Sequence, residues 1–132
     1  MDSVAVKADS GKLELAVHAH ILPYLTGICD FVKAGSRNAS KNPDNSVYCN
    51  APVIILDLNA ISRTTMRIEI YVKDIDGFKN STKLSEIRDA LVPVLGGVTL
   101  NDSYFVAHVS DITGKDNAGF SYVFLNLAVT IV

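Results

Sequence analysis

The stretch from Thr64 to Leu95 constrains the fold more than any other part of the sequence. Its first half alternates between apolar and polar residues, so that every second side chain lies on one side of an extended chain. That apolar side carries Met66, Ile68, Ile70 and Val72. An Asp-, Gly- and Asn-rich turn follows, and then the apolar residues Leu84, Ile87, Leu91 and Val94 or Leu95 recur at helical spacing. We therefore predict a strand over residues 64–75 and an amphipathic helix that folds back over its apolar face.

The segment that precedes this unit combines a helix, a possible strand and a loop. From Lys12 onwards the apolar residues follow one helical stripe, which consists of Leu13, Ala16, Val17, Ile21 and Leu22. We predict a helix over residues 10–25, bent at Pro23, and a short strand over residues 28–33. Residues 34–46 are rich in Asn, Ser, Gly and Pro, which is typical of a loop. Loops of this length are often functional, so this one is a candidate docking or lumen-facing segment.

Four further strand or turn signals complete the chain. Residues 52–60 form a continuous apolar run that predicts a central strand, paired with residues 64–75 as a hairpin with Ser62 and Arg63 at its tip. Gly96 and Gly97 would end the second helix, and residues 101–103 predict a turn. Two β-rich runs, 104–112 and 120–132, then read as a hairpin with a long tip.

These elements predict one α+β domain over residues 1–132, in the order α-β-β-β-α-β-β. We expect a mostly antiparallel sheet of four to five strands with two helices packed on one face. A chain of 132 residues is long enough to bury a sizeable core.

Composition limits the classes of function. Apolar residues make up 48% of the chain and the mean hydropathy is +0.25, which suggests apolar surface that partners cover. The net charge of −2 and the pI near 5.8 argue against a dedicated nucleic-acid-binding protein. No apolar run approaches the roughly 20 residues of a membrane span, and no secretory signal is evident at the N-terminus. We expect a soluble, unprocessed intracellular protein that does not bind membranes.

Motifs for catalysis, cofactors or metals are absent from the sequence. His18 and His20 are two residues apart, which on a helix points them to different sides, and His108 falls within a predicted strand on the side of Tyr104 and Val106. Cys29 and Cys49 fit neither a disulfide framework nor a zinc site, so reduced structural thiols are expected, with a disulfide as the alternative. Asp74 and Asp76 flank a turn, where such residues bond their own backbone. The sequence predicts no enzyme, no cofactor and no metal.

Two groups of residues are candidate interaction sites. The first lies on two strands and could either cover a helix or form a subunit contact, for which aromatic residues are favoured. It comprises Arg67, Glu69, Tyr71, Lys73, Phe120, Tyr122 and Phe124. The second is the basic set in or beside the long loop, Lys33, Arg37 and Lys41, which could dock a partner or face a lumen. Three charges over nine positions are equally compatible with a solvated loop.

The order of elements and three phrases of the sequence carry a family resemblance. The phrases are PVIIL at 52–56, RIEIYVKDIDG at 67–77 and KLSEIRDALVPVL at 83–95, followed by a two-strand finish. In this pattern, residues 12–132 resemble the tail terminator, or tail completion, proteins of long-tailed bacteriophages. The resemblance implies a small α+β domain that assembles into a hexameric ring at the head-proximal end of the tail tube.

What the resemblance implies for function is structural rather than catalytic. Such a ring ends polymerisation of the tail tube protein, joins the tail to a head–tail connector or stopper protein, and lets genomic DNA pass through its lumen without sequence-specific binding. The protein would be assembled in the host cytoplasm and located in the tail or neck of the virion. The alternatives are another neck or head-completion ring protein of the particle or, more remotely, a cellular small-ligand-binding α+β domain.

Overall fold

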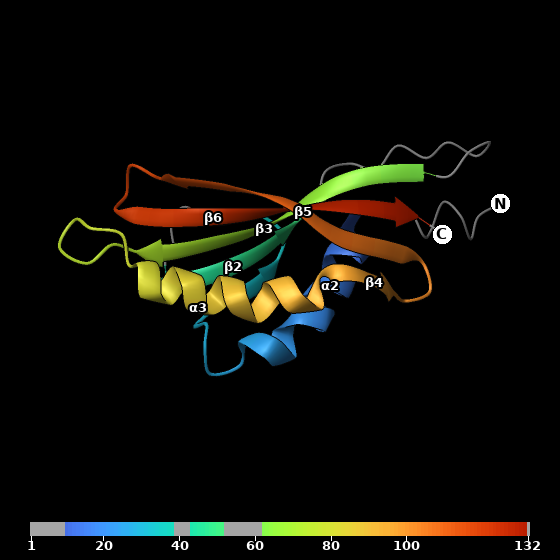
Figure 1. Cartoon of the computed structure of the whole chain (residues 1–132), viewed down its shortest axis with the longest axis horizontal. Helices are drawn as coiled ribbons and strands as arrows, with labels where there is room; N and C mark the ends of the chain where they lie inside the picture. Colours follow the sequence, from blue (N-terminus) through green and yellow to red (C-terminus); the bar gives the residue numbers. More distant parts are fainter. Residues whose placement is uncertain (1–9, 39–42, 52–61, 132) are drawn as a thin grey trace.

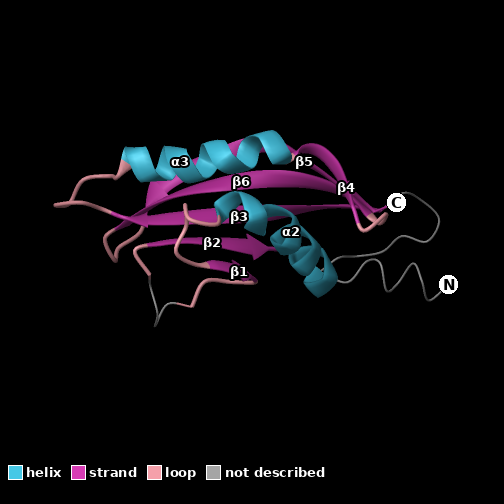
Figure 2. Cartoon of the chain, turned by 90° about the horizontal axis from the view of Figure 1, so that it is seen from below, coloured by secondary structure: helices cyan, strands magenta, loops and turns pink. Residues whose placement is uncertain are grey.

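The structure is a computed structural model that describes residues 10–38, 43–51 and 62–131. Within these residues two helices lie on one face of a single sheet, as Figures 1 and 2 show. The helices are α2 (Ser10–Leu25) and α3 (Ser81–Leu91), the latter continued by the 3-10 turn η1 (Val92–Val94). The strands are β1 (Val32–Ala34), β2 (Asn45–Asn50), β3 (Ser62–Lys73), β4 (Gly96–Leu100), β5 (Tyr104–Lys115) and β6 (Phe120–Ile131). The α+β class and the placement of both helices on one face are as predicted.

The described sheet is mixed and has six strands, in the order β1-β2-β3-β6-β5-β4. Strand β1 pairs with β2 in parallel, and every other pairing is antiparallel. The central pair β3–β6 runs in register over its whole length, from Ser62 opposite Ile131 to Lys73 opposite Phe120. This long central pair fixes which side chains share a face.

Local sequence chemistry sets the bounds of both helices. Helix α3 begins after Asn80, whose side-chain oxygen accepts a hydrogen bond from the Lys83 backbone N–H at 3.2 Å. It ends where Pro93 follows, and the chain tightens into η1. Helix α2 spans the predicted range and contains Pro23 in its last turn, where one lost backbone hydrogen bond is tolerated.

The core lies between the helices and the inner face of the sheet. The predicted apolar side of β3 is buried in it, together with alternate residues of β6 and the apolar positions of α3. Ile68, Ile70, Leu125 and Leu127 are fully buried. From α2 the core receives Leu13, Val17, Ile21 and Leu25, whereas Leu22, predicted on the same stripe, is 41% exposed. These four residues follow one another at i+4 spacing, and Leu22 lies on the flank of that line.

Three predictions about strands need correction. Residues 45 and 46 were assigned to the loop and residues 47–50 to no element, but 45–50 form β2. Gly96 and Gly97, expected to stop the helix, begin β4 (Gly96–Leu100), so the sheet has six strands rather than four to five. Ser62 and Arg63 are not a hairpin tip, because both pair with β6 opposite Ile131 and Thr130. Long β6 offers partners along its whole length, so β3 extends further than its own alternation indicates. The strand predicted at 52–60 lies outside the described residues.

Candidate interaction surface

The seven strand residues predicted as an interaction site come together on one face of the sheet. In the β3–β6 register Glu69 lies opposite Phe124, and Tyr71 lies opposite Tyr122. Lys73 pairs with Phe120, and Arg67 is two residues before Glu69 on the same side of β3. All seven alternate with core residues and therefore point away from the two helices. We call this surface of β2, β3, β6 and β5 the outer face.

Aromatic rings form a continuous chain across the outer face. The rings of Tyr122 and Phe124 stack with their centroids 4.3 Å apart, and Tyr71 meets the Phe124 ring edge-on at 5.7 Å. Tyr48 of β2 extends the chain, with its ring centroid 5.8 Å from that of Tyr71. Tyr48 was not predicted as part of the site because no strand was predicted over residues 47–50. Such rings contribute apolar area together with a polar tip, a combination that suits protein interfaces.

Arg37 reaches from the loop after β1 onto this aromatic chain. Its guanidinium carbon lies 4.0 Å from the centroid of Tyr71 and 4.7 Å from that of Phe120. Its Nη1 forms an ion pair with Asp116 at 2.8 Å, in the turn between β5 and β6. Arg37 is therefore held against the sheet by contacts within the chain. Of the other two loop residues predicted for docking, Lys33 donates to the Ser36 carbonyl at 3.2 Å, and Lys41 lies outside the described residues.

The carboxylate of Asp116 is well stabilised in its charged form. Partial burial by itself raises the pKa of Asp116, but the hydrogen bond from Arg37 and the backbone N–H groups of Phe120 and Ala118 outweigh it and hold the pKa below its usual value. This carboxylate links the β5–β6 turn to the loop that carries Arg37.

A second guanidinium group lies next to a buried carboxylate on the outer face. Arg67 lies 4.6 Å from the Phe124 ring centroid, and its Nη2 is 3.0 Å from Glu69 Oε2. Glu69 is only 5% exposed, and Asn50 also donates to it at 3.4 Å. Burial, and next the nearby charge of Glu69, raise the pKa of Tyr71. The outer face thus carries paired charges among aromatic rings.

The outer face continues onto β5, beyond the predicted site. A bulge between His108 and Ser110 resets the register, after which Ile112 pairs with Phe124 and is 46% exposed. Further along, Tyr122 lies across Gly114, where an added Cβ would meet the tyrosine hydroxyl at 2.5 Å. Glycine at this position therefore allows the tyrosine ring to lie flat against the sheet. No pattern in the sequence predicts the bulge or the close approach of Tyr122 to Gly114.

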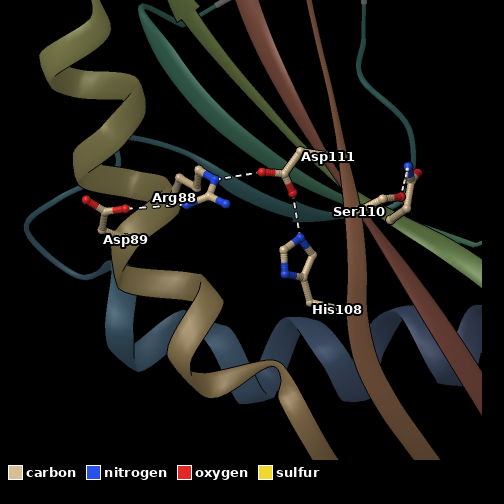
Figure 3. Close-up of polar contacts among 6 residues, drawn as sticks. Arg88, Asp89, His108, Ser110 and Asp111 are labelled. Carbon is tan, nitrogen blue, oxygen red and sulfur yellow. Dashed lines mark hydrogen bonds and ion pairs between the residues drawn. The ribbon is translucent and has the colours of Figure 1, made fainter.

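A polar cluster lies on the helix side of the same bulge, as Figure 3 shows. The carboxylate of Asp111 accepts a hydrogen bond from Arg88 Nε at 2.7 Å and contacts His108 Nε2 at 2.5 Å. Partial burial raises the pKa of Asp111, but the hydrogen bonds from His108 and Arg88 lower it further than burial raises it. Arg88 also approaches Asp89 at 3.6 Å. On the other side of β5, the side-chain amide of Asn126 donates to the Ser110 hydroxyl at 3.1 Å. This cluster links α3 to β5 through the ion pair of Arg88 with Asp111.

The remaining candidate groups have structural partners. Cys29 and Cys49 are both free thiols, and burial raises the pKa of Cys49 to about 12. His18 and His20 contact different backbone carbonyls, those of Val32 and Val94, at 3.3 and 2.8 Å. Within residues 10–38, 43–51 and 62–131 we find no group of three side chains that could hold a metal ion. No helix in that part of the chain is long and apolar enough to cross a membrane.

Comparison with known proteins supports the fold alone. No protein-family model and no curated protein matches the sequence. Among solved structures that do match, one whose name says nothing about function aligns with 100% of this chain and 96% of its own, with a TM-score of 0.53 and 13% sequence identity. An alignment over nearly the full length of both chains indicates that the same arrangement of elements occurs elsewhere.

Proposed function

We propose that this chain is a ring-forming structural protein of a long-tailed bacteriophage, positioned at the head-proximal end of the tail tube. In this role it ends polymerisation of the tail tube protein and joins the tail to a head–tail connector or stopper protein. Genomic DNA passes through the lumen of the ring. The observation that carries the proposal is the outer face, an aromatic and guanidinium-rich sheet surface that neither helix covers. The family resemblance of residues 12–132 supplies the particle and the position.

The chemistry of the outer face favours a protein partner over water. Tyrosine, phenylalanine and arginine are the residues enriched at the centre of protein interfaces. Here they form one patch, in which Tyr71, Tyr122 and Phe124 contact one another and Arg67 lies over Phe124. Ile112 extends the patch on β5 at 46% exposure. A ring closes through unlike surfaces on neighbouring copies, so one such patch on each copy is compatible with it.

The charge of the chain also suits a channel for DNA. The net charge of the chain is −2. Arg37, one of the cations predicted to face the lumen, forms an ion pair with Asp116. A lumen lined by many free lysines would bind the phosphate backbone at each step and slow its passage. A mildly acidic ring lets the duplex slide.

Negative-stain electron microscopy of the purified protein tests the proposal. We expect closed rings of uniform diameter with a central hole. A population of stable monomers at micromolar concentration would contradict the proposal, as would compact dimers without a hole.

Two charge insertions test whether the outer face makes the contact. Phe124→Asp and Ile112→Asp each place a carboxylate in the patch and should dissociate the ring into monomers that elute later in size-exclusion chromatography. Ile112→Asp is the safer variant, because Phe124 lies opposite the buried Glu69 and an acid there also destabilises the fold. The matched control is Ser85→Asp, on the exposed surface of α3, which should leave the ring intact. Intact rings from a folded Ile112→Asp protein would exclude the outer face as the contact.

A further inference from the structure

Strand β5 is paired along the whole of one edge but only along part of the other. On one side it pairs with β6 from Tyr104 to Lys115, whereas on the other side β4 pairs only with Tyr104–Ala107. One further backbone bond, from the His108 N–H to the Leu95 carbonyl at 2.7 Å, ends this second ladder at the bulge. Among the described residues, no strand pairs with this side of β5 beyond that point. We call this side of residues 109–115 the open edge.

The register shows which backbone groups point to the open edge. The Asp116 N–H donates to the Phe120 carbonyl at 2.9 Å, so these two residues form a hydrogen-bonded pair where β5 meets β6. In an antiparallel ladder such pairs alternate with pairs that do not bond each other. Along the register, Lys115, Thr113 and Asp111 therefore do not bond β6, and their N–H and C=O groups point away from it. Three donors and three acceptors lie in a row on the open edge.

The side chains around the open edge leave this row accessible. Residues 109–113 are all exposed, Val109 to 62% and Ile112 to 46%. Edge strands are often protected from pairing by a lysine side chain. Lys115 is not free for that role, because its Nζ reaches back across the sheet to the Asp74 carboxylate at the end of β3, 3.3 Å away.

We propose that the open edge binds an extended segment of a partner protein, which adds a strand to the sheet. The backbone groups of the edge repeat at every second residue, and the main chain of another extended segment repeats at the same interval. Such a segment can therefore bond all of them at once, as in other cases of strand addition. This contact is made by main-chain groups at an edge rather than by side chains of the outer face. It goes beyond the proposed ring and does not depend on it.

The surroundings of the open edge specify the side chains of the bound segment. Side chains of an added strand alternate between the two faces of the sheet. On the outer face they lie beside Ile112, which is paired with Phe124, so apolar residues fit there. On the helix side they lie near the ion pair of 2.7 Å between Arg88 and Asp111, which joins α3 to β5 (Figure 3), so polar residues fit there. The partner is a segment in which apolar and polar residues alternate.

Hydrogen exchange resolved by NMR tests the geometry of the edge in the free protein. The amides of Asp111 and Thr113 should exchange at least about tenfold faster than those of Ile112 and Gly114, which the register directs to β6. Equal protection of all four amides would show that the edge is already paired and would overturn the proposal. Protection of Asp111 and Thr113 that appears only at high protein concentration would identify a second copy as the occupant, and would also overturn it.

A synthetic peptide as long as the open edge tests binding. In this probe valine alternates with threonine between two terminal lysines. Its addition should shift the NMR signals of the Asp111 and Thr113 amides and slow their exchange by about tenfold or more at saturation. With the valines beside Ile112, the threonine amides face β5 and the valine amides face water. Absence of binding would overturn the proposal.

Two methylated forms of the peptide separate main-chain pairing from apolar adhesion. Methylation of the threonine amides removes the donors that face β5, so this form should bind at least about tenfold more weakly than the unmodified peptide. Methylation of the valine amides should change affinity less than about threefold. Equal affinities of the two methylated forms would exclude strand addition.

A variant of the protein provides the matching test. Thr113→Pro removes one donor from the open edge without removing a bond to β6, and proline is tolerated on edge strands where the N–H faces solvent. It should weaken peptide binding by about tenfold or more, whereas Thr113→Val, which keeps the N–H, should change it less than about threefold. Circular dichroism checks that both variants fold, and the methylated peptides test the wild-type protein if the proline variant does not.

The outcomes separate the open edge from the proposed ring. A folded Thr113→Pro protein that binds the peptide as tightly as the wild type overturns the open edge and leaves the proposed function intact. A wild-type protein that stays monomeric but binds the peptide overturns the ring and supports the open edge.

Discussion

The two faces of the same sheet differ in how their apolar side chains are covered. On the inner face, Ile70 and Leu125 are fully buried beneath α2 and α3. On the outer face, their sequence neighbours Tyr71 and Phe124 contact each other, neighbouring rings and arginine side chains. The inner face carries hydrocarbon side chains, which cannot form hydrogen bonds with water and are therefore stable only when buried. The outer face contains rings with polar tips and guanidinium groups, which can meet either water or a partner.

This difference shows how one strand contributes to the core with one side and, in the ring that we propose, leaves its other side for a subunit contact. Because side chains alternate, a change at Leu125 acts on the core and a change at Phe124 acts on the surface, although the residues are adjacent. The predictions below test this division by comparing the loss of folding stability from each face.

The largest expected effect is on the inner face. Leu125→Ala should lower the free energy of unfolding by about 2–5 kcal/mol, since it leaves a cavity beneath the helices. Ile112→Ala, on the outer face and 46% exposed, should cost less than about 1 kcal/mol. Urea denaturation of both variants checks the difference. Similar losses from the two would show that the outer face is part of the core.

An intermediate effect is expected at Arg37. Arg37→Leu removes contacts with the rings of Tyr71 and Phe120 and the ion pair with Asp116, and should cost about 1–2 kcal/mol. The control is Arg63→Leu, an exposed arginine at the other end of β3, which should change stability by less than about 0.5 kcal/mol. The same urea titration compares them. If Arg37→Leu left the free energy of unfolding unchanged, the loop would not hold the outer face in place.

The smallest expected effect is on how folding stability depends on pH in the acid range. The pKa of Asp116 is lower in the folded protein than in the unfolded chain, so the unfolded chain takes up the proton first as the pH falls. The stability from this carboxylate is therefore present above its ordinary pKa near 3.8 and is lost as the pH falls through the folded value. Asp116→Asn should make the urea midpoint fall less steeply below pH 5. An unchanged slope would exclude Asp116 as a contributor.

Much of the fold could be predicted from periodicity. Alternation located β3 with its buried side, β-rich composition located β5 and β6, and helical spacing located α2 and α3. Strand β2 was missed because Asn45 and Ser46 are typical of loops, whereas here Asn45 is buried and bonds the backbone N–H and the carboxylate of Asp30. Strand β4 was missed because Gly96 and Gly97 resemble a helix stop. Tertiary pairing decided both cases against local propensity.

The candidate site was likewise predictable only where a periodic pattern encodes it. Alternation alone placed Tyr71 and Phe124 on one side of their strands, and antiparallel pairing then brought the two strands together. The position of Arg37 over Tyr71 depends on the path of an irregular loop, which no periodic pattern encodes. The bulge before Ser110, which brings Ile112 beside Phe124, likewise has no signature in composition.

Native mass spectrometry of the full chain tests the central claim, that further copies cover the surface left open by the fold. The account predicts one closed assembly of a single stoichiometry above two, which persists on dilution and is lost in the Ile112→Asp variant. A wild-type protein that is monomeric across the micromolar range would contradict the account.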